Sequence, residues 1–309
     1  MEIAAFAATV LGIVTGLWFL WDKFVGVVRK ESAGLSGHPI KALVLERTPL
    51  FRSGERLELG KQTAIVGGLG KTAITEWLSA LCDTAKLARW MALPEGLPIV
   101  YTVETNGDPG EVRISIRQHE VTYSVHGDPV PSSPFPLRVF FVEMKSFFSE
   151  GLDDAEIIST HLGIPIVTLK NYASLVGRAS FYSISEVEFR SREAGVDVYV
   201  DIGGVKRRYC LLSGSEQGRV LTELGIAAAQ FTSRNTPTVL VIECNSFSFD
   251  DARIDMYLQF LSDADLGFQI IMVSHDVDRD WKSWDVVELI GDAPLTEIVV
   301  GPSKPGRSG

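Results

Sequence analysis

Residues 67–72 read GGLGKT and combine the residue types that hold a phosphate group. Glycines allow a tight turn whose backbone N–H groups converge on an anion, and a following helix adds the positive end of its dipole. A lysine in such a loop reaches the outer phosphates, and a Ser or Thr hydroxyl holds Mg²⁺. The sequence therefore predicts that nucleotide phosphates bind at Gly67, Gly68, Gly70, Lys71 and Thr72, and that Thr72 also binds the metal.

The loop departs from the complete phosphate-loop pattern at its beginning. The pattern G-x-x-x-x-G-K-T requires a glycine at position 65, where the chain has Ile65. If Gly67 is taken as the first glycine, the loop is two residues short. The alternative interpretation is a glycine-rich turn from a strand into a helix that binds no nucleotide.

A second motif, LSGSEQ, occupies residues 212–217. It precedes a segment whose apolar residues, from Val220 to Phe231, fall on one helical stripe. The motif therefore begins a helix. By itself it also fits a simple N-cap, in which Ser213 or Ser215 accepts a backbone hydrogen bond near Glu216 or Gln217.

Two more polar residues follow buried strands. Glu243 ends the apolar run Val239–Ile242, and His275 comes after Gln269–Val273 and Ser274. By itself, a lone histidine is in general more often structural.

The order of these four motifs resembles the nucleotide-binding heads of ABC-type ATPases, in the SMC, RecF and OLD-like AAA branch. The resemblance covers about Lys41 to Val300. It implies an α/β P-loop NTPase fold with an antiparallel β lobe and a helical subdomain. It also implies ATP and Mg²⁺ as cofactors, and a homodimer that holds ATP between two facing heads.

Within this family, the second motif of one head contacts the γ-phosphate of ATP bound to the other head. Carried over to this chain, that role falls to Ser213 and Gly214, with Ser215 beside them. Asp250 would occupy the loop that crosses the dimer interface, and Asp251 is the competing choice. His275 would contact the γ-phosphate.

The acid after the strand is atypical, because the residue that normally follows as the catalytic glutamate is Cys244. Two interpretations remain. Either Glu243 orients the metal and hydrolysis is slow or absent, or the strand is shifted by one residue and Glu243 is itself the base. The glutamine that usually senses Mg²⁺ is not recognisable, and Glu143 or Gln118 would have to replace it.

The elements that position these residues are expected in a characteristic order. Strands are predicted at 43–45, 57–59, 63–66, 184–189 and 197–202, and helices within 153–180. Alternating segments at 98–104, 112–117, 120–125 and 137–142, separated by Gly- and Pro-containing turns, are expected to form the β lobe. No heptad repeat is present between the glycine loop and LSGSEQ, so the long coiled coil of SMC proteins is missing.

The segment from Ile3 to Trp21 contains no charged residue and as a helix would span the roughly 30 Å hydrocarbon core of a bilayer. Lys23, Arg29 and Lys30 follow it, which favours a single pass with the body in the cytoplasm. We therefore expect a transmembrane anchor at 1–22, a linker at 23–40 and the head at 41–309, attached to the inner (cytoplasmic) membrane. The alternative is a helix buried in a protein partner or in an oligomer of this chain.

Composition narrows the choice of partners. The formal net charge of -10 does not favour nucleic-acid binding, although Lys206-Arg207-Arg208 forms one basic cluster, whose simpler interpretation is a solvated strand end. The three cysteines are widely spaced, which argues against a disulfide framework and a zinc site.

Together these features predict a membrane-anchored ATPase that dimerises around Mg-ATP, hydrolyses it slowly and gates a partner effector, in bacterial defence or DNA maintenance. The alternatives are a non-hydrolysing nucleotide-sensing scaffold and a membrane-tethered adaptor whose glycine loop is degenerate.

Overall fold

The structure is a computed structural model. It describes residues 37–93, 97–144, 150–177, 184–193, 195–244, 251–263, 266–291 and 297–302. The chain divides into two units, Met1–Ser36 and Gly37–Gly309, and all the described residues belong to the second. The predicted membrane segment 3–21 and Asp250 lie outside the described residues. Within the part of the chain that is described, no helix is both long and apolar enough to cross a bilayer.

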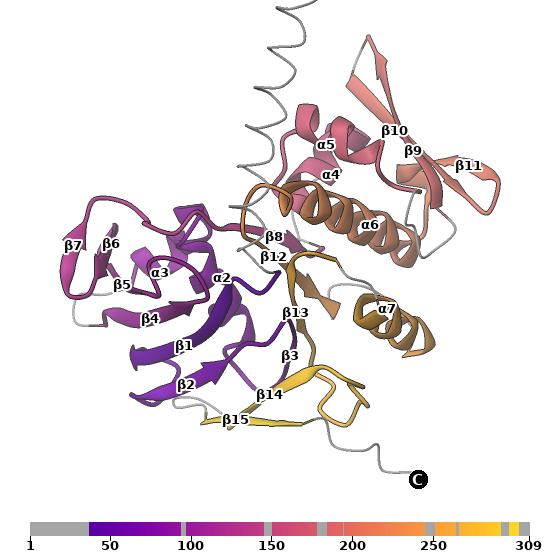
Figure 1. Ribbon diagram of the computed structural model, residues 1–309. Helices are drawn as coiled ribbons and strands as arrows, with labels where there is room; N and C mark the ends of the chain where they lie inside the picture. Colours follow the sequence, from indigo (N-terminus) through magenta and orange to yellow (C-terminus); the bar gives the residue numbers. More distant parts are fainter. Residues whose placement is uncertain are drawn as a thin grey trace, which may run out of the picture. The chain divides into compact units, whose positions relative to one another are not determined.

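The centre of the second unit is a six-stranded sheet in the order β15-β14-β3-β13-β12-β8 (Figure 1). Its strands are β3 (Gln62–Gly67), β8 (Arg138–Val142), β12 (Thr238–Glu243), β13 (Gln269–Val273), β14 (Asp285–Ile290) and β15 (Glu297–Pro302). All are parallel to their neighbours except β15, which pairs antiparallel with β14. The continuous apolar runs of β3, β12 and β13 fit this position, because parallel strands are covered on both faces.

A second, fully antiparallel sheet has the order β2-β1-β4-β5-β6-β7 and forms the β lobe. Its strands are β1 (Ile40–Arg47), β2 (Glu55–Glu58), β4 (Ile99–Thr105), β5 (Glu111–Arg117), β6 (Glu120–Val125) and β7 (Asp128–Val130). Helix α2 (Lys71–Ser79), η1 (Thr84–Leu87) and α3 (Ala88–Met91) lie with it. Trp77 of α2 is fully buried and stacks on Tyr101 of β4, so α2 joins the lobe to the central sheet.

One prediction about the lobe is wrong. Residues 137–142 were expected to belong to the antiparallel lobe, but they form β8, which pairs parallel with β12 at the edge of the central sheet. The alternation of apolar and polar residues in this segment is typical of a half-buried strand of either kind. What places β8 is its contact with the long helix α6 (Gly214–Thr232), where Gly225 lies directly against Val142.

A helical subdomain packs on the other side of the central sheet. It contains α4 (Asp154–Leu162), α5 (Ile166–Ala173) and α6, together with the hairpin sheet β9 (Ile184–Arg192), β10 (Gly195–Ile202) and β11 (Val205–Arg208). The short η2 (Tyr209–Leu211) leads from β11 into α6, and α7 (Asp251–Asp263) follows β12. Asp154 anchors the hairpin, because its buried carboxylate accepts hydrogen bonds from Val198 N–H and Arg208 Nε.

The central sheet separates two hydrophobic cores. In β12, Val239 and Val241 face the core that contains α2, whereas Leu240, Ile242 and Cys244 face the core that contains α6. The polar residues Lys71, Glu243 and His275 lie at or after the carboxyl ends of β3, β12 and β13. Because these strands are parallel, their carboxyl ends lie at one edge of the sheet.

Candidate functional site

The glycine loop is a tight connection from β3 into α2. Strand β3 continues through Gly67, and only Gly68, Leu69 and Gly70 separate it from α2. Gly67 and Gly70 have φ values of +88° and +101°, a conformation that favours glycine. A Cβ on Gly67 would also lie 2.6 Å from the Leu289 carbonyl oxygen, and one on Gly70 would overlap the ring of Phe51. These two glycines are therefore required by the turn itself.

The amino end of α2 is open to an anion. Its N-cap, Gly70, provides no side-chain hydrogen bond, and the first turn contains no acidic residue. The first N–H groups of a helix have no partner within the helix, and together with the dipole they attract negative charge. One donor of the loop is already used, because Gly68 N–H donates to the Leu289 carbonyl at 2.7 Å. The loop therefore offers fewer backbone N–H donors to a phosphate group than a complete phosphate loop does.

Lys71 and His275 meet at this loop. Lys71 is only 5% exposed, and its ammonium donates to the carbonyl oxygens of Gly67 and of Gly68, the latter at 2.6 Å. Its Nζ also lies 3.1 Å from His275 Nδ1. Because a charged lysine is only a donor, Nδ1 has to be the unprotonated ring nitrogen in this contact. Burial lowers the pKa of Lys71, and the charge of Glu243 acts in the opposite direction.

Glu243 and Cys244 point to opposite sides of β12. Glu243 is half-buried, and its charge acts on Lys71. Cys244 is buried in the core that contains α6, and this burial raises the pKa of its thiol to about 12. A thiol with that pKa is not a proton acceptor at neutral pH. Both interpretations of Glu243, as metal ligand and as base, remain compatible with its position.

Glu143 and Gln118 are the two candidates for the role of the glutamine that usually senses Mg²⁺. The register of the central sheet separates them. Val142 of β8 is level with Ile242 of β12, so Glu143 follows β8 next to Glu243, and its Oε1 lies 2.8 Å from Lys86 Nζ. Gln118 lies in the turn between β5 and β6 of the lobe. Of these two, only Glu143 shares the edge of the sheet with the glycine loop.

These residues fit Mg²⁺ only together with a nucleotide. Among the described residues, no group of three or more His, Cys, Asp or Glu side chains could hold a metal ion alone. Mg²⁺ commonly takes one or two carboxylates and completes its shell with substrate phosphates and water. The hydroxyl of Thr72, at the start of α2, and the carboxylate of Glu243 match that requirement.

The LSGSEQ motif begins α6, as expected. Ser213 is the N-cap, and it forms a reciprocal capping box with Glu216. Glu216 Oε2 accepts from Ser213 N–H at 2.9 Å and from Ser213 Oγ at 3.0 Å, while its Oε1 lies 2.6 Å from Arg207 Nη2. The capping interpretation is thus realised, and Ser213 and Gly214 are nonetheless exposed, with Ser215 half-buried.

The LSGSEQ motif and the glycine loop lie towards the same edge of the central sheet. After α6 the chain turns within Ser233–Pro237 and enters β12. A helix that precedes a parallel strand runs back along the sheet, so the first residues of α6 point towards the edge where β3 and β12 end. Within the described chain, Ser213 is held by Glu216 rather than by Lys71.

The remaining expectations have mixed outcomes. Asp250 lies outside the described residues, and Asp251 is the first residue of α7. The basic cluster at 206–208 is not a free positive surface, because all three side chains pair with carboxylates of Glu186, Glu188, Glu216, Asp154 or Asp197. The simpler interpretation of this cluster is therefore correct.

Sequence reasoning missed Arg279. Its side chain is 6% exposed, and it joins Asp255 of α7 at 2.7 Å to Asp276, the residue after His275, at 3.2 Å. Arg279 thus ties the loop that carries His275 to α7. The available signal was the alternation of three aspartates with one arginine in residues 276–280, DVDRD.

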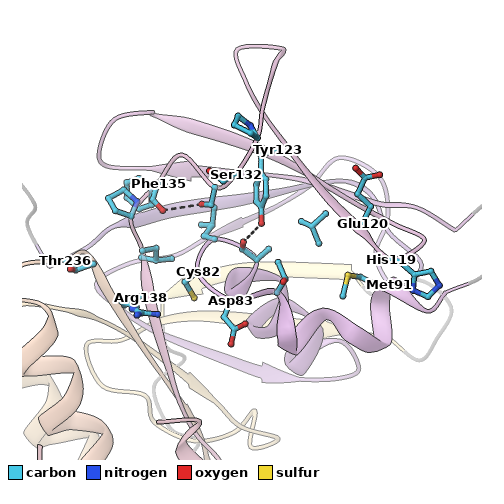
Figure 2. Close-up of a pocket in the computed structure, with 18 residues that line it drawn as sticks. Cys82, Asp83, Met91, His119, Glu120, Tyr123, Ser132, Phe135, Arg138 and Thr236 are labelled. Atoms are coloured by element: carbon cyan, nitrogen blue, oxygen red, sulfur yellow. Dashed lines mark hydrogen bonds between the residues drawn. The ribbon is translucent and has the colours of Figure 1, made fainter. Parts of the chain in front are cut away.

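An open cavity of about 870 Å³ lies apart from this site, at the carboxyl end of α2 (Figure 2). Its lining includes Cys82, Asp83, His119 and Arg138. Because α2 rises about 1.5 Å per residue, the helix separates this cavity from Lys71 by more than 10 Å. The cavity therefore does not contribute to the site at the glycine loop.

Comparisons with solved structures identify the fold. An SMC head bound to the C-winged helix domain of ScpA matches with a TM-score of 0.57 and 14% identity, over 85% of this chain and 97% of that one. The SMC head domain from Thermotoga maritima matches with 0.52 and 16%, over 85% and 98%. The recombination mediator protein RecF with ATP matches with 0.53 and 12%, also over 85% and 98%.

No model of a protein family matches the sequence, and no curated protein matches it. The structural matches cover most of the chain, and they show that it has the fold of the ATPase heads of SMC and RecF proteins. At these identities the matches show the fold alone. The α/β architecture with an antiparallel lobe and a helical subdomain is confirmed.

Proposed function

We propose that the chain is an ABC-type ATPase head that binds Mg-ATP at Lys71 and pairs with a second copy around it. The observation that carries this proposal is the contact between Lys71 and His275 at the uncapped amino end of α2, with Glu243 nearby. A buried cation, a helix dipole and a metal-binding carboxylate meet at one sheet edge. That combination suits the terminal phosphates of a nucleotide.

Each residue has a defined task in this proposal. Lys71 leaves the loop carbonyls and pairs with the outer phosphates, and His275 is then released to contact the γ-phosphate. Thr72 and Glu243 would hold Mg²⁺, which would neutralise charge on the phosphates. Ser213 and Gly214 of the second copy would donate hydrogen bonds to the γ-phosphate from the start of α6, and the role at the dimer interface would fall to Asp250 by resemblance to the family.

Hydrolysis is slow in this scheme, because Cys244 replaces the usual glutamate and does not accept a proton at neutral pH. A long-lived ATP-bound dimer suits a switch better than a motor. The dimer would gate a partner effector, in bacterial defence or DNA maintenance. The SMC head with the ScpA domain is a protein of this fold bound to a protein partner, which supports an effector at the level of analogy.

We further propose that residues 3–21 anchor the head in the cytoplasmic membrane, with residues 23–40 as the linker and the head in the cytoplasm. The support is the uncharged run of this segment and the cations after it. Membrane fractions of cells that express the whole chain should retain it after a high-salt wash. A variant without residues 1–36 should move to the soluble fraction, and retention of that variant would contradict the anchor.

ATP binding and dimerisation are tested in one experiment on the whole chain in detergent. ATP with Mg²⁺ is titrated by calorimetry, and the mass of the complex is measured in parallel by light scattering. Binding accompanied by a doubling of mass supports the proposal, and Lys71→Met should show neither. No heat of binding at millimolar ATP would instead select the membrane-tethered adaptor with a degenerate loop.

One observation favours a second candidate, a nucleotide-sensing scaffold that does not hydrolyse ATP. It is the burial of Cys244 at the position of the catalytic base. The two candidates differ in a single measurement. Dimers that form with ATP but release no phosphate over hours select the scaffold, whereas release that depends on Glu243 selects the slow ATPase.

A further inference from the structure

Arg279 is a buried cation close to the edge of the sheet that carries the site. Its side chain is 6% exposed, and its guanidinium lies between Asp255 of α7, at 2.7 Å, and Asp276, at 3.2 Å. Burial raises the pKa of the Cys244 thiol, and the charge of Arg279 acts in the opposite direction, so the guanidinium also lies near the end of β12. The end of β12, the loop after β13 and helix α7 therefore meet at Arg279.

Stability alone does not account for this arginine. A buried guanidinium loses its hydration, and replacing a buried ion pair by apolar residues of similar size is often neutral or stabilising. The two carboxylates keep much of their contact with water, since the side chain of Asp255 is 51% exposed and that of Asp276 43%. The desolvation cost falls mainly on Arg279. What results is a fixed connection between α7 and the loop that carries His275.

His275 depends on its neighbours in the chain for its position, because the residue itself is exposed. On one side, Ser274 is buried, and its N–H donates to the Ile65 carbonyl of β3 at 3.0 Å. On the other side, Asp276 N–H donates to Ser274 Oγ at 3.1 Å, and the Asp276 carboxylate lies at Arg279. Arg279 therefore fixes the residue after His275, as the central sheet fixes the residue before it.

We propose that Arg279 is a positioning residue for His275, and that through it the position of α7 governs the contact between His275 and Lys71. That contact lies within one molecule, at 3.1 Å between His275 Nδ1 and Lys71 Nζ, so the inference requires no dimer. It rests on the proposed function only in assigning His275 to the γ-phosphate of ATP. A displacement of α7 moves Asp255 and, through Arg279, the loop that presents the imidazole to Lys71.

Selective ¹⁵N NMR of the histidine side chains, on the whole chain in detergent, tests this connection. His275→Gln identifies the His275 signal among the five histidines, and Lys71→Met shows how the Nδ1 signal moves when the contact is lost. We expect Arg279→Met to move the Nδ1 signal in the same direction, and Lys71→Met to move it no further in that background. Calorimetry of Arg279→Met should show ATP binding weakened by roughly 2- to 30-fold, the effect expected of a residue that acts through its neighbours.

Two further variants separate positioning from a loss of stability. Asp255→Asn removes the α7 end of the bridge at a half-exposed position, so it serves even where Arg279→Met fails to fold, and it should move the Nδ1 signal in the same direction. Ser262→Ala is the matched control. Ser262 lies two turns after Asp255 on the same side of α7, and its Oγ accepts from Trp284 Nε1, at the end of the same loop, at 2.7 Å. Ser262→Ala should lower the melting temperature and leave the Nδ1 signal in place.

The outcomes distinguish this inference from the proposed function. An Nδ1 signal that stays in place in Arg279→Met and Asp255→Asn, or that moves equally in Ser262→Ala, would overturn the positioning role. If the signal moves as expected but the wild type binds no ATP, Arg279 still positions His275, and the proposed function alone fails.

Discussion

Lys71 Nζ lies 3.1 Å from His275 Nδ1, although 204 positions separate the two residues in the chain. Strands β3 and β13 are parallel neighbours in the central sheet, and Val273, the last residue of β13, lies opposite Ile65, two residues before the end of β3. The contact therefore follows from the strand order. It places the cation of the glycine loop against the imidazole ring of His275.

Replacing Lys71 with methionine separates binding from stability. Burial disfavours the charged ammonium of Lys71 and lowers its pKa. A neutral side chain of similar length removes this desolvation cost, but it also removes the hydrogen bonds to the carbonyl oxygens of Gly67 and Gly68. We expect ATP binding to fall at least 100-fold, because a charge-assisted phosphate contact is lost. Without nucleotide these two effects oppose each other, so the melting temperature should change by no more than about 2–4 °C, which corresponds to roughly 1 kcal/mol. Calorimetry and thermal unfolding check the two parts, and a large drop in melting temperature would contradict the second.

The pH dependence of stability follows from the same residue. The pKa of Lys71 is lower in the folded protein than its ordinary value of 10.5. Between the two values the unfolded chain binds more protons than the folded protein, so Lys71 contributes stability that rises with pH in that window. ATP binding should weaken over the same window, because the ammonium is lost. Urea unfolding of wild type and Lys71→Met from pH 7 to 10.5 measures the difference, and parallel curves would contradict it.

Glu243 and Cys244 should respond differently to substitution, since they face opposite sides of β12. Glu243→Gln keeps the shape but removes the carboxylate that would hold Mg²⁺, so phosphate release should fall about 100-fold or more. Cys244→Ala should retain turnover within about twofold and lose on the order of 1 kcal/mol of stability through a small cavity. Measurements of phosphate release and of urea unfolding on both variants test these expectations. Equal loss of turnover in both variants would indicate that Cys244 takes part in the chemistry.

Ser213 tests whether the LSGSEQ motif does more than cap α6. Ser213→Asp preserves a good N-cap and should change the unfolding free energy by less than about 0.5 kcal/mol. It also places a carboxylate where the γ-phosphate would bind, so ATP-dependent dimers should disappear. Ser213→Ala is the complementary control, expected to lose about 1 kcal/mol of stability with a smaller effect on dimers. If Ser213→Asp still dimerises with ATP, the motif is only a cap.

Several features of the fold could be predicted because they are local. Strand β3, the glycine turn and α2 follow one another directly in the chain. The Ser213–Glu216 capping box is also local, because its S-x-x-E spacing places both side chains within hydrogen-bond distance of the other residue's backbone N–H. The apolar stripe of α6 requires only a helical period of 3.6 residues. These elements depend on contacts over a few positions, and pattern is sufficient for them.

Other features could not be predicted, because the partner in each contact is remote in sequence. An alternating segment such as 138–142 fits either sheet, and its parallel pairing with β12 places it in the central one. The choice of Glu143 over Gln118 follows from that pairing. Arg279 was missed because a lone arginine among aspartates is typical of a solvated loop, whereas here its side chain is buried between α7 and the His275 loop.

The sequence by itself determined the order of the motifs and the kind of element that each one begins or ends, since backbone preference and apolar periodicity act over one or two turns. Only the tertiary structure decided that Lys71, His275, Glu243 and Glu143 share one edge, because strand order and register fix which distant loops meet. It also decided that Cys244 faces the core that contains α6, while Glu243 lies beside the glycine loop. Successive residues of a strand point to opposite faces, and the packing of both faces determines which one is buried.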